Sequence, residues 1–238
     1  MPETFSYALQ DGLAEITMDD GKVNAMSDPF FDGLNSVLDQ AEKDAARAVI
    51  IKGRPGLFSA GLNLKVLPTL DQQALAATMT SFGRTMLRVY GFPIPTVAAV
   101  SGHAIAGGAM LMHACDLRVM AEGPYRIQLN ETAIGLTLPS WAIAIAERGI
   151  PDRWHTEAIL HARPYTPEEA LERGIIDEIA RPADQLVEAA RARAALAASL
   201  DTAAYGATKA RQRDADLQRV GALIEKEASG DGLRGKGR

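Results

Sequence analysis

The sequence predicts an α/β fold that ends in a region of helices only, and three observations carry this prediction. Short apolar runs typical of strands recur through much of the chain, at residues 4–19, 48–51, 96–100, 117–120 and 175–179. Segments with apolar residues at helical spacing lie between these runs. From Asp184 to about Glu227 the sequence has the Ala-, Arg-, Glu- and Leu-rich composition of long helices.

The first half of the chain alternates strand and helix patterns. Residues 4–19 read as two strands joined by the turn Asp11-Gly12. Ser27, followed by Asp28 and Pro29, is a good helix start, and apolar residues at helical spacing follow as far as residue 41. The continuously apolar run 48–51 is typical of a strand in a parallel sheet, and residues 71–90 form the next predicted helix.

The second half begins with the strand at Thr96, which breaks at Ser101-Gly102. The chain then passes through Ala106-Gly107-Gly108 into a buried helix. A strand follows at 117–120, an irregular segment at 127–137, and helices at 140–148 and 154–161. Thr166, with Pro167 and two glutamates after it, begins another helix, and a strand follows Gly174 at 175–179. The tail from Ser229 to Arg238 has the composition of a disordered segment.

Composition excludes several classes of protein. The 238 residues are 47% hydrophobic and 23% charged, as in a globular domain with a substantial core. A formal net charge of −5 argues against a nucleic-acid or membrane partner, because no basic face is present. The acidic N-terminus is unlike a signal peptide and no long apolar run occurs, so we expect a cytoplasmic location. Cys115, the single cysteine, is expected to be a buried apolar residue, with nucleophile as the alternative.

Familiar motifs for cofactors and metals do not fit. The glycines from Gly102 to Gly108 lack the Lys-Ser/Thr of a phosphate-binding loop, and no Gly-x-Gly-x-x-Gly follows an early strand. We therefore expect no nucleotide cofactor. The four histidines show no metal-ligand spacing, so no metal site is expected; they are His103, His113, His155 and His161.

Two glycine turns, Ala60-Gly61-Leu62 and Ala106-Gly107-Gly108, are the strongest pointers to chemistry. Each turn follows an apolar strand, and we expect the two strands to lie in one sheet. The second turn also begins a helix. Backbone N–H groups at a helix start are free and lie at the positive end of the helix dipole. Two such turns side by side can each direct one N–H at the same carbonyl oxygen and stabilise an enolate-like thioester. Alternatively, the glycines only permit close packing of helix on sheet.

Five segments, in order, resemble the crotonase (enoyl-CoA hydratase/isomerase) superfamily. Residues 58–65, Phe-Ser-Ala-Gly-Leu-Asn-Leu-Lys, resemble its F-C-A-G-A-D-L-K motif. Residues 98–109 resemble its A-A-V-N-G-x-A-x-G-G-G motif, and residues 115–116 the Cys-Asp that closes it. Residues 22–26 and 166–177 resemble its K-A-L-N-A-L and A-x-x-A-x-x-x-G-L-V-D stretches. The resemblance covers residues 5 to about 185.

The resemblance implies a fold, a ligand and a set of site residues. The fold would be a spiral of ββα turns over residues 1–185, and residues 186–238 would form helices used in assembly of a homotrimer or hexamer. The substrate would be an acyl-CoA thioester of fatty-acid metabolism, with coenzyme A present only as part of the substrate. The N–H groups of Leu62 and Gly107 would bind the thioester oxygen. Ala25, Ala60, Gly61 and the segment Leu62, Asn63, Leu64 and Lys65 would border the coenzyme A chain.

Departures from the family pattern favour one reaction. Met110 stands where hydratases carry a glutamate, so one of their two carboxylates is missing. The second corresponds to Glu131, in a Leu-Asn-Glu-Thr-x-x-Gly segment that resembles the mitochondrial-type 3,2-trans-enoyl-CoA isomerases. Moving a double bond needs one acid/base, whereas hydration usually shares its work between two carboxylates. The sequence therefore favours an isomerase that uses Glu131, with Met110 as pocket lining.

Alternatives remain open at this stage. A hydratase, or another crotonase reaction run with one glutamate, is the second reading, and a non-catalytic acyl-CoA-binding homologue is the third. Glu131 is otherwise a solvated loop acid or half of a buried ion pair, and Met110 a plain core residue. Lys65 either meets a phosphate of coenzyme A or is a solvated lysine. Asp116 is expected to be structural, as are His103, His113 and Arg126.

Overall fold

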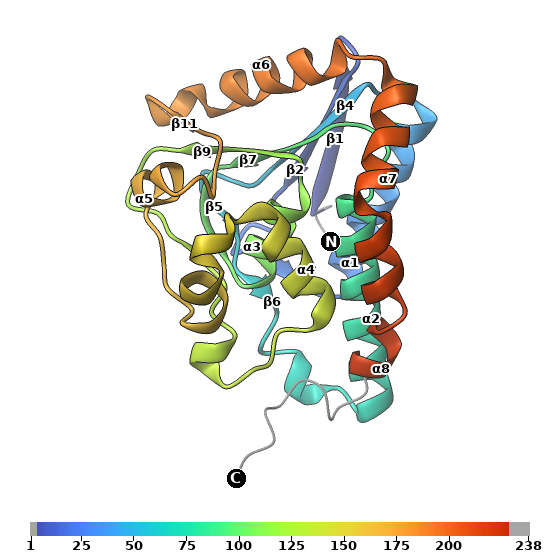
Figure 1. Cartoon of the computed structure of the whole chain (residues 1–238), viewed down its shortest axis with the longest axis vertical. Helices are drawn as coiled ribbons and strands as arrows, with labels where there is room; N and C mark the ends of the chain where they lie inside the picture. Colours follow the sequence, from blue (N-terminus) through green and yellow to red (C-terminus); the bar gives the residue numbers. More distant parts are fainter. Residues whose placement is uncertain (1–3, 229–238) are drawn as a thin grey trace.

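The computed structural model describes residues 4–228, and a six-stranded sheet organises the fold (Figure 1). The strand order is β1-β2-β4-β7-β9-β11. β1 and β2 pair antiparallel around Asp11-Gly12, and all other neighbours are parallel. The strands span Phe5–Gln10 (β1), Leu13–Met18 (β2), Ala48–Lys52 (β4), Thr96–Val100 (β7), Leu117–Ala121 (β9) and Glu178–Ala180 (β11). The predicted α/β class and the predicted hairpin are confirmed.

Two smaller sheets stand beside the main one. β5, β8 and β10 form a parallel sheet in the order β10-β8-β5, and β3 pairs with β6. Their bounds are Gly56–Ser59 (β5), Gly102–Ile105 (β8), Ile127–Gln128 (β10), Ala25–Met26 (β3) and Gly61–Leu62 (β6). The sequence reading, in which the chain passes from Ser101-Gly102 straight to the second glycine turn, was wrong, because β8 intervenes. Strand β8 is held by partners far away in the sequence.

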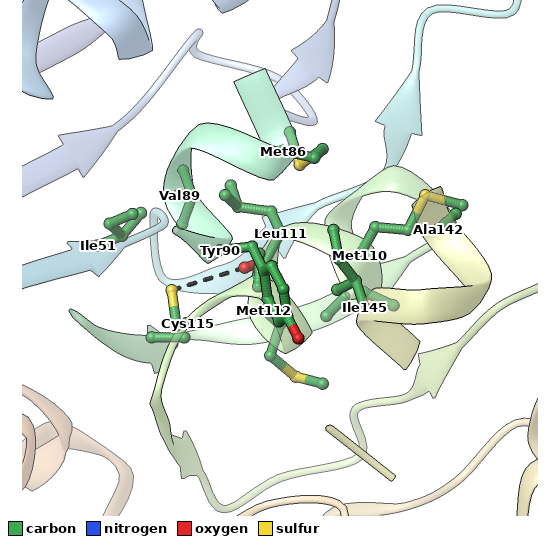
Figure 2. Packing of buried hydrophobic residues seen from close by; sticks show 14 of the residues in the cluster. Ile51, Met86, Val89, Tyr90, Met110, Leu111, Met112, Cys115, Ala142 and Ile145 are labelled. Atoms are coloured by element: carbon green, nitrogen blue, oxygen red, sulfur yellow. Dashed lines mark hydrogen bonds between the residues drawn. The ribbon is translucent and has the colours of Figure 1, made fainter. Parts of the chain in front are cut away.

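Four helices pack on one face of the sheet and enclose the main core. They are α1 (Asp28–Lys43), α2 (Gln72–Tyr90), α3 (Gly107–Ala114) and α4 (Ser140–Gly149). Aromatic rings join them: Phe31 of α1 stacks on Phe82 of α2 at 5.4 Å, and Phe82 meets the edge of Trp141 of α4 at 4.8 Å. Figure 2 shows the side chains of α3 packed among those of α2 and α4. Helix α3, which begins at the second glycine turn, therefore lies at the centre of this core, as its apolar sequence predicts.

The last helices complete the fold on two sides. They are α5 (Pro167–Glu172), α6 (Leu186–Ala198), α7 (Thr202–Gly221) and α8 (Ile224–Ala228). Ala190 and Ala194 of α6 pack on the opposite face of the main sheet, against side chains such as Ile50 and Val97. α7 packs against α4 and α2, and α8 continues down α2 (Figure 1). The division into a core of residues 1–185 and an assembly region of residues 186–238 stays a prediction.

Element details correct the sequence reading in two places and confirm the irregular segment predicted at 127–137. The helix predicted over 154–161 is a 3₁₀ turn, Asp152–Trp154, followed by a π-helix, Thr156–Leu160. The strand predicted from Ile175 begins only at Glu178. The segment 127–137 is irregular apart from β10 and a 3₁₀ turn at Thr132–Ile134. The predicted helix start at Thr166 is confirmed as a capping box with Glu169.

Two further expectations concern the ends and membrane insertion. The tail that the sequence predicts to be disordered lies outside the described residues. Within residues 4–228, no helix is both long enough and apolar enough to cross a membrane.

Candidate active site

The two glycine turns lie against each other, as the sequence predicts. β5 and β8, which precede them, are parallel neighbours in the small sheet, so both turns leave the same edge. A Cβ atom on Gly61 would lie 2.7 Å from the backbone N of Gly107, and Gly61 has a φ of +81°. Only glycine combines that conformation with so close an approach. The strands that lead into the turns lie in one sheet, as the sequence predicts, and this is the small sheet β10-β8-β5.

Asn24 and Ser59 hold the first turn in place. The Asn24 side chain donates to the carbonyl oxygens of Met18 and Phe58, at 2.9 and 3.0 Å. The Ser59 hydroxyl donates to the Asn24 carbonyl at 2.7 Å and accepts from the Gly61 N–H at 3.1 Å. Both side chains are fully buried, so these bonds form without competition from water. They fix the backbone just before Leu62.

The second turn places the start of α3 at the same point. Gly107 is the first residue of the helix, so its N–H has no acceptor within the helix. Ala106 precedes it with φ +51° and ψ −122°, a strained conformation for alanine. A Cβ atom on Gly107 would meet Met26 and Phe82 at 2.9 Å. The positive end of the α3 dipole is therefore buried beside Leu62 and Gly61.

A pocket opens in front of the two turns, and we call it the Glu131 pocket. Six of the predicted site residues line it: Ala60, Leu62, Leu64, Gly107, Met110 and Glu131. Its other walls are mostly apolar and come from α2 and from the loop after β10: Met79, Phe82, Ala106, Asn130, Ile134, Leu136, Thr137 and Pro139. An apolar pocket with few polar groups is the usual form of a small-molecule site.

Glu131 is the one residue in the lining whose side chain titrates, and its position is set by the loop around it. Its carbonyl oxygen accepts from the N–H groups of Ile134 and Leu136, at 3.1 and 2.9 Å, and Gly135 turns the chain with φ +76°. The side chain is 7% exposed. Its Oε2 atom has no hydrogen-bond partner among the described residues.

Burial of the Glu131 carboxyl changes its chemistry. Loss of solvation raises its pKa from 4.5 to about 7, because the charged form is disfavoured in the apolar pocket. The two alternative interpretations of Glu131, a solvated loop acid and half of a buried ion pair, were wrong. Glu131 is neither solvated nor part of an ion pair with any described residue. A carboxyl that is close to half-protonated at neutral pH can take up and return a proton.

Met110 faces the pocket and the core at once. It lines the Glu131 pocket and is 2% exposed. Figure 2 shows it among side chains of α3 and α4, including Ala142 and Ile145. A thioether cannot transfer a proton, so the pocket holds one acid/base and the two readings of Met110 are compatible.

The remaining predicted residues lie outside the lining. Ala25 of β3 pairs with Gly61 of β6, beside the first turn. The Asn63 N–H donates to the Met26 carbonyl at 2.9 Å, and its side-chain oxygen accepts from the Lys65 N–H at 3.2 Å. Lys65 is exposed, and its ammonium has no hydrogen-bond or ion-pair partner among the described residues. Together these residues form the surface next to the pocket mouth.

Several pocket residues were not singled out as site residues from the sequence. Asn130 lines the pocket, and its Oδ1 atom is buried without a partner among residues 4–228. Its place immediately before Glu131 was the available signal. Met79 and Phe82 were recognised only as the apolar face of a helix, since nothing local shows that this face reaches residues from 60 to 139.

Residues expected to be structural have structural roles. Asp116 accepts from the Thr96 N–H at 2.8 Å and pairs with Lys209 and Arg213, at 2.7 and 2.6 Å. Cys115 is buried, and burial raises the pKa of its thiol to about 12, which leaves no reactive thiolate at neutral pH. His103 accepts from the Arg126 N–H at 3.2 Å. Within the described part of the chain, no group of His, Cys, Asp or Glu side chains could hold a metal ion.

Fold and site together define an α/β protein with a lone carboxyl opposite two backbone turns in an apolar pocket. Sequence comparison identifies the family more closely. The family model for enoyl-CoA hydratase/isomerase matches residues 8–229. This chain therefore belongs to the enoyl-CoA hydratase/isomerase, or crotonase, family, as its motifs predict.

Individual relatives include both kinds of enzyme. Human mitochondrial enoyl-CoA delta isomerase 1 is 32% identical over 231 residues, which cover 91% of this chain and 76% of that protein. A probable enoyl-CoA hydratase of Bacillus subtilis is 32% identical over 193 residues, covering 80% and 74%. The crystal structure of the probable enoyl-CoA hydratase EchA3 of Mycobacterium tuberculosis superposes with a TM-score of 0.90 at 37% identity, covering 96% of both chains. The predicted crotonase fold is confirmed.

Proposed function

We propose that this protein moves the double bond of a 3-enoyl-CoA to the 2-position, with Glu131 as the single acid/base. One observation carries the proposal: Glu131 is the only residue in the pocket lining that can exchange a proton near neutral pH. The position of a second carboxylate is taken by Met110. Similarity to an enoyl-CoA delta isomerase supports the same reading.

The proposed reaction is a proton transfer from C2 to C4. The Glu131 carboxylate removes a proton from C2, and the electrons of that C–H bond move into the thioester to form a dienolate. Protonated Glu131 then returns the proton to C4, which leaves the double bond between C2 and C3. A carboxyl with a pKa of about 7 suits both steps, since it is a competent base and a competent acid at neutral pH.

Negative charge that develops on the thioester oxygen needs donors. We assign this role to the N–H groups of Leu62 and Gly107. Both residues line the pocket, and Gly107 lies at the positive end of α3. Loss of one such donor in other enzymes costs ~3–4 kcal/mol in transition-state stabilisation.

An acyl-CoA thioester fits the rest of the site. The apolar walls from α2 and α3 suit the acyl chain, which enters past the half-exposed Leu64. Ala25, Ala60, Gly61 and the segment from Leu62 to Lys65 border the path of the coenzyme A chain in this proposal, with Lys65 near a phosphate. Assembly as a homotrimer or hexamer belongs to the same proposal, and sedimentation equilibrium measures it.

A second candidate reaction is hydration, and Asn130 is the observation that favours it. A buried amide oxygen without a partner, in the same pocket as Glu131, can accept a hydrogen bond from a water molecule. Glu131 would then deprotonate that water as its oxygen adds to C3, and would afterwards protonate C2, which leaves a 3-hydroxyacyl thioester. Incorporation of ¹⁸O from labelled water into a 2-enoyl-CoA substrate separates hydration from isomerisation.

The decisive experiment compares the wild type with Glu131→Gln and a control variant. Formation of the conjugated 2-enoyl thioester from a 3-enoyl-CoA is followed by absorbance, and acyl-CoA binding is measured by calorimetry. We expect Glu131→Gln to abolish turnover and to retain binding. Glu172→Gln, at an exposed glutamate that has no ion pair with residues 4–228, is expected to retain both. Full activity of Glu131→Gln would remove this residue from the mechanism. Binding by the wild type without turnover of either substrate would identify a non-catalytic homologue.

A further inference from the structure

A second cavity shares no lining residue with the Glu131 pocket. It is a cleft of about 680 Å³ between the first half of α7, the end of α6 and the C-terminal ends of α3 and α4. We call it the α7 cleft. Residues that line it include Asp116, Arg118, Arg148, Lys209 and Arg213. None of these has a role in the proposed reaction.

Positive charge in the α7 cleft exceeds negative charge. Four cationic side chains line it, against the carboxylates of Asp116 and Asp201. Lys209 and Arg213 are only 5% and 7% exposed, and both form their ion pair with the same carboxylate, that of Asp116. Two buried cations with one buried anion leave a net positive charge in a region of low dielectric, which is unfavourable unless a further anion is present.

The other three charged groups do not restore the balance. Asp201 is occupied as the cap of α7, where it accepts from the Ala204 N–H at 2.7 Å. Arg118 is paired with Asp177 at 3.0 Å, at the edge of the cleft. Arg148, in the last turn of α4, is exposed and has no ion pair with any of residues 4–228. It therefore adds a full positive charge to the cleft wall.

Lys209 and Arg213 also donate to the backbone carbonyls of Ile94 and Tyr90, but other donors in this cluster lack an acceptor. The Nε atoms of Arg118 and Arg213 are buried and have no acceptor in the described structure. The side chain of Arg213 is only 8% exposed, and the guanidinium stacks on Tyr90 at 4.3 Å. Arginine nitrogens are donors only, so each buried one without an acceptor is destabilising. His113, at the same cleft, also has an unpartnered buried Nδ1 atom.

We infer that the α7 cleft is an anion-binding site that accepts a phosphate or carboxylate group. The guanidinium of Arg148 contacts this group directly, and Arg118, Lys209 and Arg213 supply the positive field behind it. Planar guanidinium groups are suited to both kinds of oxyanion. The anion has two sources, a free small molecule or an acidic side chain of a second copy of this chain, and both present the same chemistry.

Inorganic phosphate is the probe for the first test. The midpoint of thermal unfolding of the full chain is measured against phosphate concentration, with chloride at matched ionic strength as the reference. A ligand that binds only the folded state stabilises it by RT ln(1 + [L]/Kd), so the midpoint rises with the logarithm of phosphate concentration once that concentration exceeds Kd. We expect this logarithmic rise in the wild type, beyond the general salt effect seen in chloride. Loss of one charge-assisted hydrogen bond in Arg148→Ala is expected to raise the fitted Kd for phosphate about tenfold.

Arg211→Ala is the matched control, because it removes the same charge from an exposed position of α7 outside the cleft. Its fitted Kd for phosphate should stay within about twofold of the wild-type value. Absence in the wild type of a logarithmic rise beyond that seen in chloride would overturn the proposal. Equal losses in Arg148→Ala and Arg211→Ala would also overturn it. Turnover of enoyl-CoA is measured in parallel and should be the same in all three proteins, so the result is independent of the proposed reaction.

Sedimentation velocity with and without phosphate distinguishes the two sources. If the acidic group comes from a second copy, phosphate competes with it, so the sedimentation coefficient falls as phosphate rises and Arg148→Glu weakens the assembly. If a free anion is the ligand, the sedimentation coefficient is independent of phosphate and of Arg148→Glu.

Discussion

Replacing Glu131 with Gln is expected to stabilise the fold above neutral pH and to leave its stability unchanged in mild acid. Burial raises the pKa of this carboxyl from 4.5 to about 7. Between these two values the folded state binds a proton that the unfolded state has released, so stability falls as pH rises. Below 4.5 both states are protonated, and above 7 both are ionised, with the folded state carrying a desolvated charge.

The magnitude follows from the same two pKa values. Each pH unit between them contributes ~1.4 kcal/mol, so a rise from 4.5 to about 7 corresponds to roughly 3 kcal/mol of destabilisation at alkaline pH. Glutamine has nearly the same shape and no charge. The Glu131→Gln variant should therefore unfold with a free energy roughly 3 kcal/mol above the wild type at about pH 8, and with nearly the same free energy at about pH 4.

Urea unfolding at these two pH values, followed by circular dichroism, provides the assay. Glu172→Gln serves as the control, since this exposed glutamate of α5 has no ion pair in the described residues and its replacement should change little at either pH. A difference between wild type and Glu131→Gln that is equal at both pH values would refute the reasoning. It would mean that the Glu131 carboxylate is solvated or paired in solution.

Three further predictions concern the pH dependence of the rate, the close packing of a glycine and a buried ion pair. The value of kcat/KM should rise with pH and level off above about 7, because the base form of Glu131 is required, and a pH–rate profile of the wild type checks this. Gly108→Ala should prevent folding or destabilise by ~3 kcal/mol or more, since its Cβ would lie 2.2 Å from the Ser59 carbonyl oxygen. Gly221→Ala, where a Cβ meets nothing within 4 Å, should instead stabilise by ~0.5–1 kcal/mol, and urea unfolding compares the two. Asp116→Asn should destabilise by ~3–5 kcal/mol in the same assay, because Lys209 and Arg213 lose their buried anion; an effect under ~1 kcal/mol would contradict that role.

Local sequence was sufficient for the elements of the main sheet and the helices that cover it. The turn Asp11-Gly12 has positive φ at both residues, as its sequence requires, and the apolar run at 48–51 is a buried parallel strand. β8 was not predicted because only four residues form it and its pairing with β5 and β10 is long-range. The π-helix at Thr156–Leu160 was read as an ordinary helix, because apolar spacing does not register one added residue per turn.

The site divides in the same way between local and long-range information. The glycine motifs were sufficient to predict that the turns at Gly61 and Gly107 lie together, since the need for glycine there is a property of the backbone. The walls supplied by Met79 and Phe82 depend on how α2 lies across the sheet, which no local pattern records. The strain at Ala106 was also invisible, because alanine at that position gives no sign of a positive φ.

A single carboxyl in this pocket has a consequence for the operating pH. Desolvation, only partly opposed by a backbone hydrogen bond, raises the pKa of Glu131 to about 7, so proton uptake and release are balanced near neutrality without help from another charge. A second carboxylate at the position of Met110, which is 2% exposed, would be equally desolvated and would repel the first. At least one of the two pKa values would then rise further, and the pair would need additional donors to remain ionised. The described pocket offers no cationic side chain for that purpose. In the proposed reaction, Met110 thus helps to keep the pKa of Glu131 near neutrality, and the apolar lining of the pocket suits the transfer of one proton.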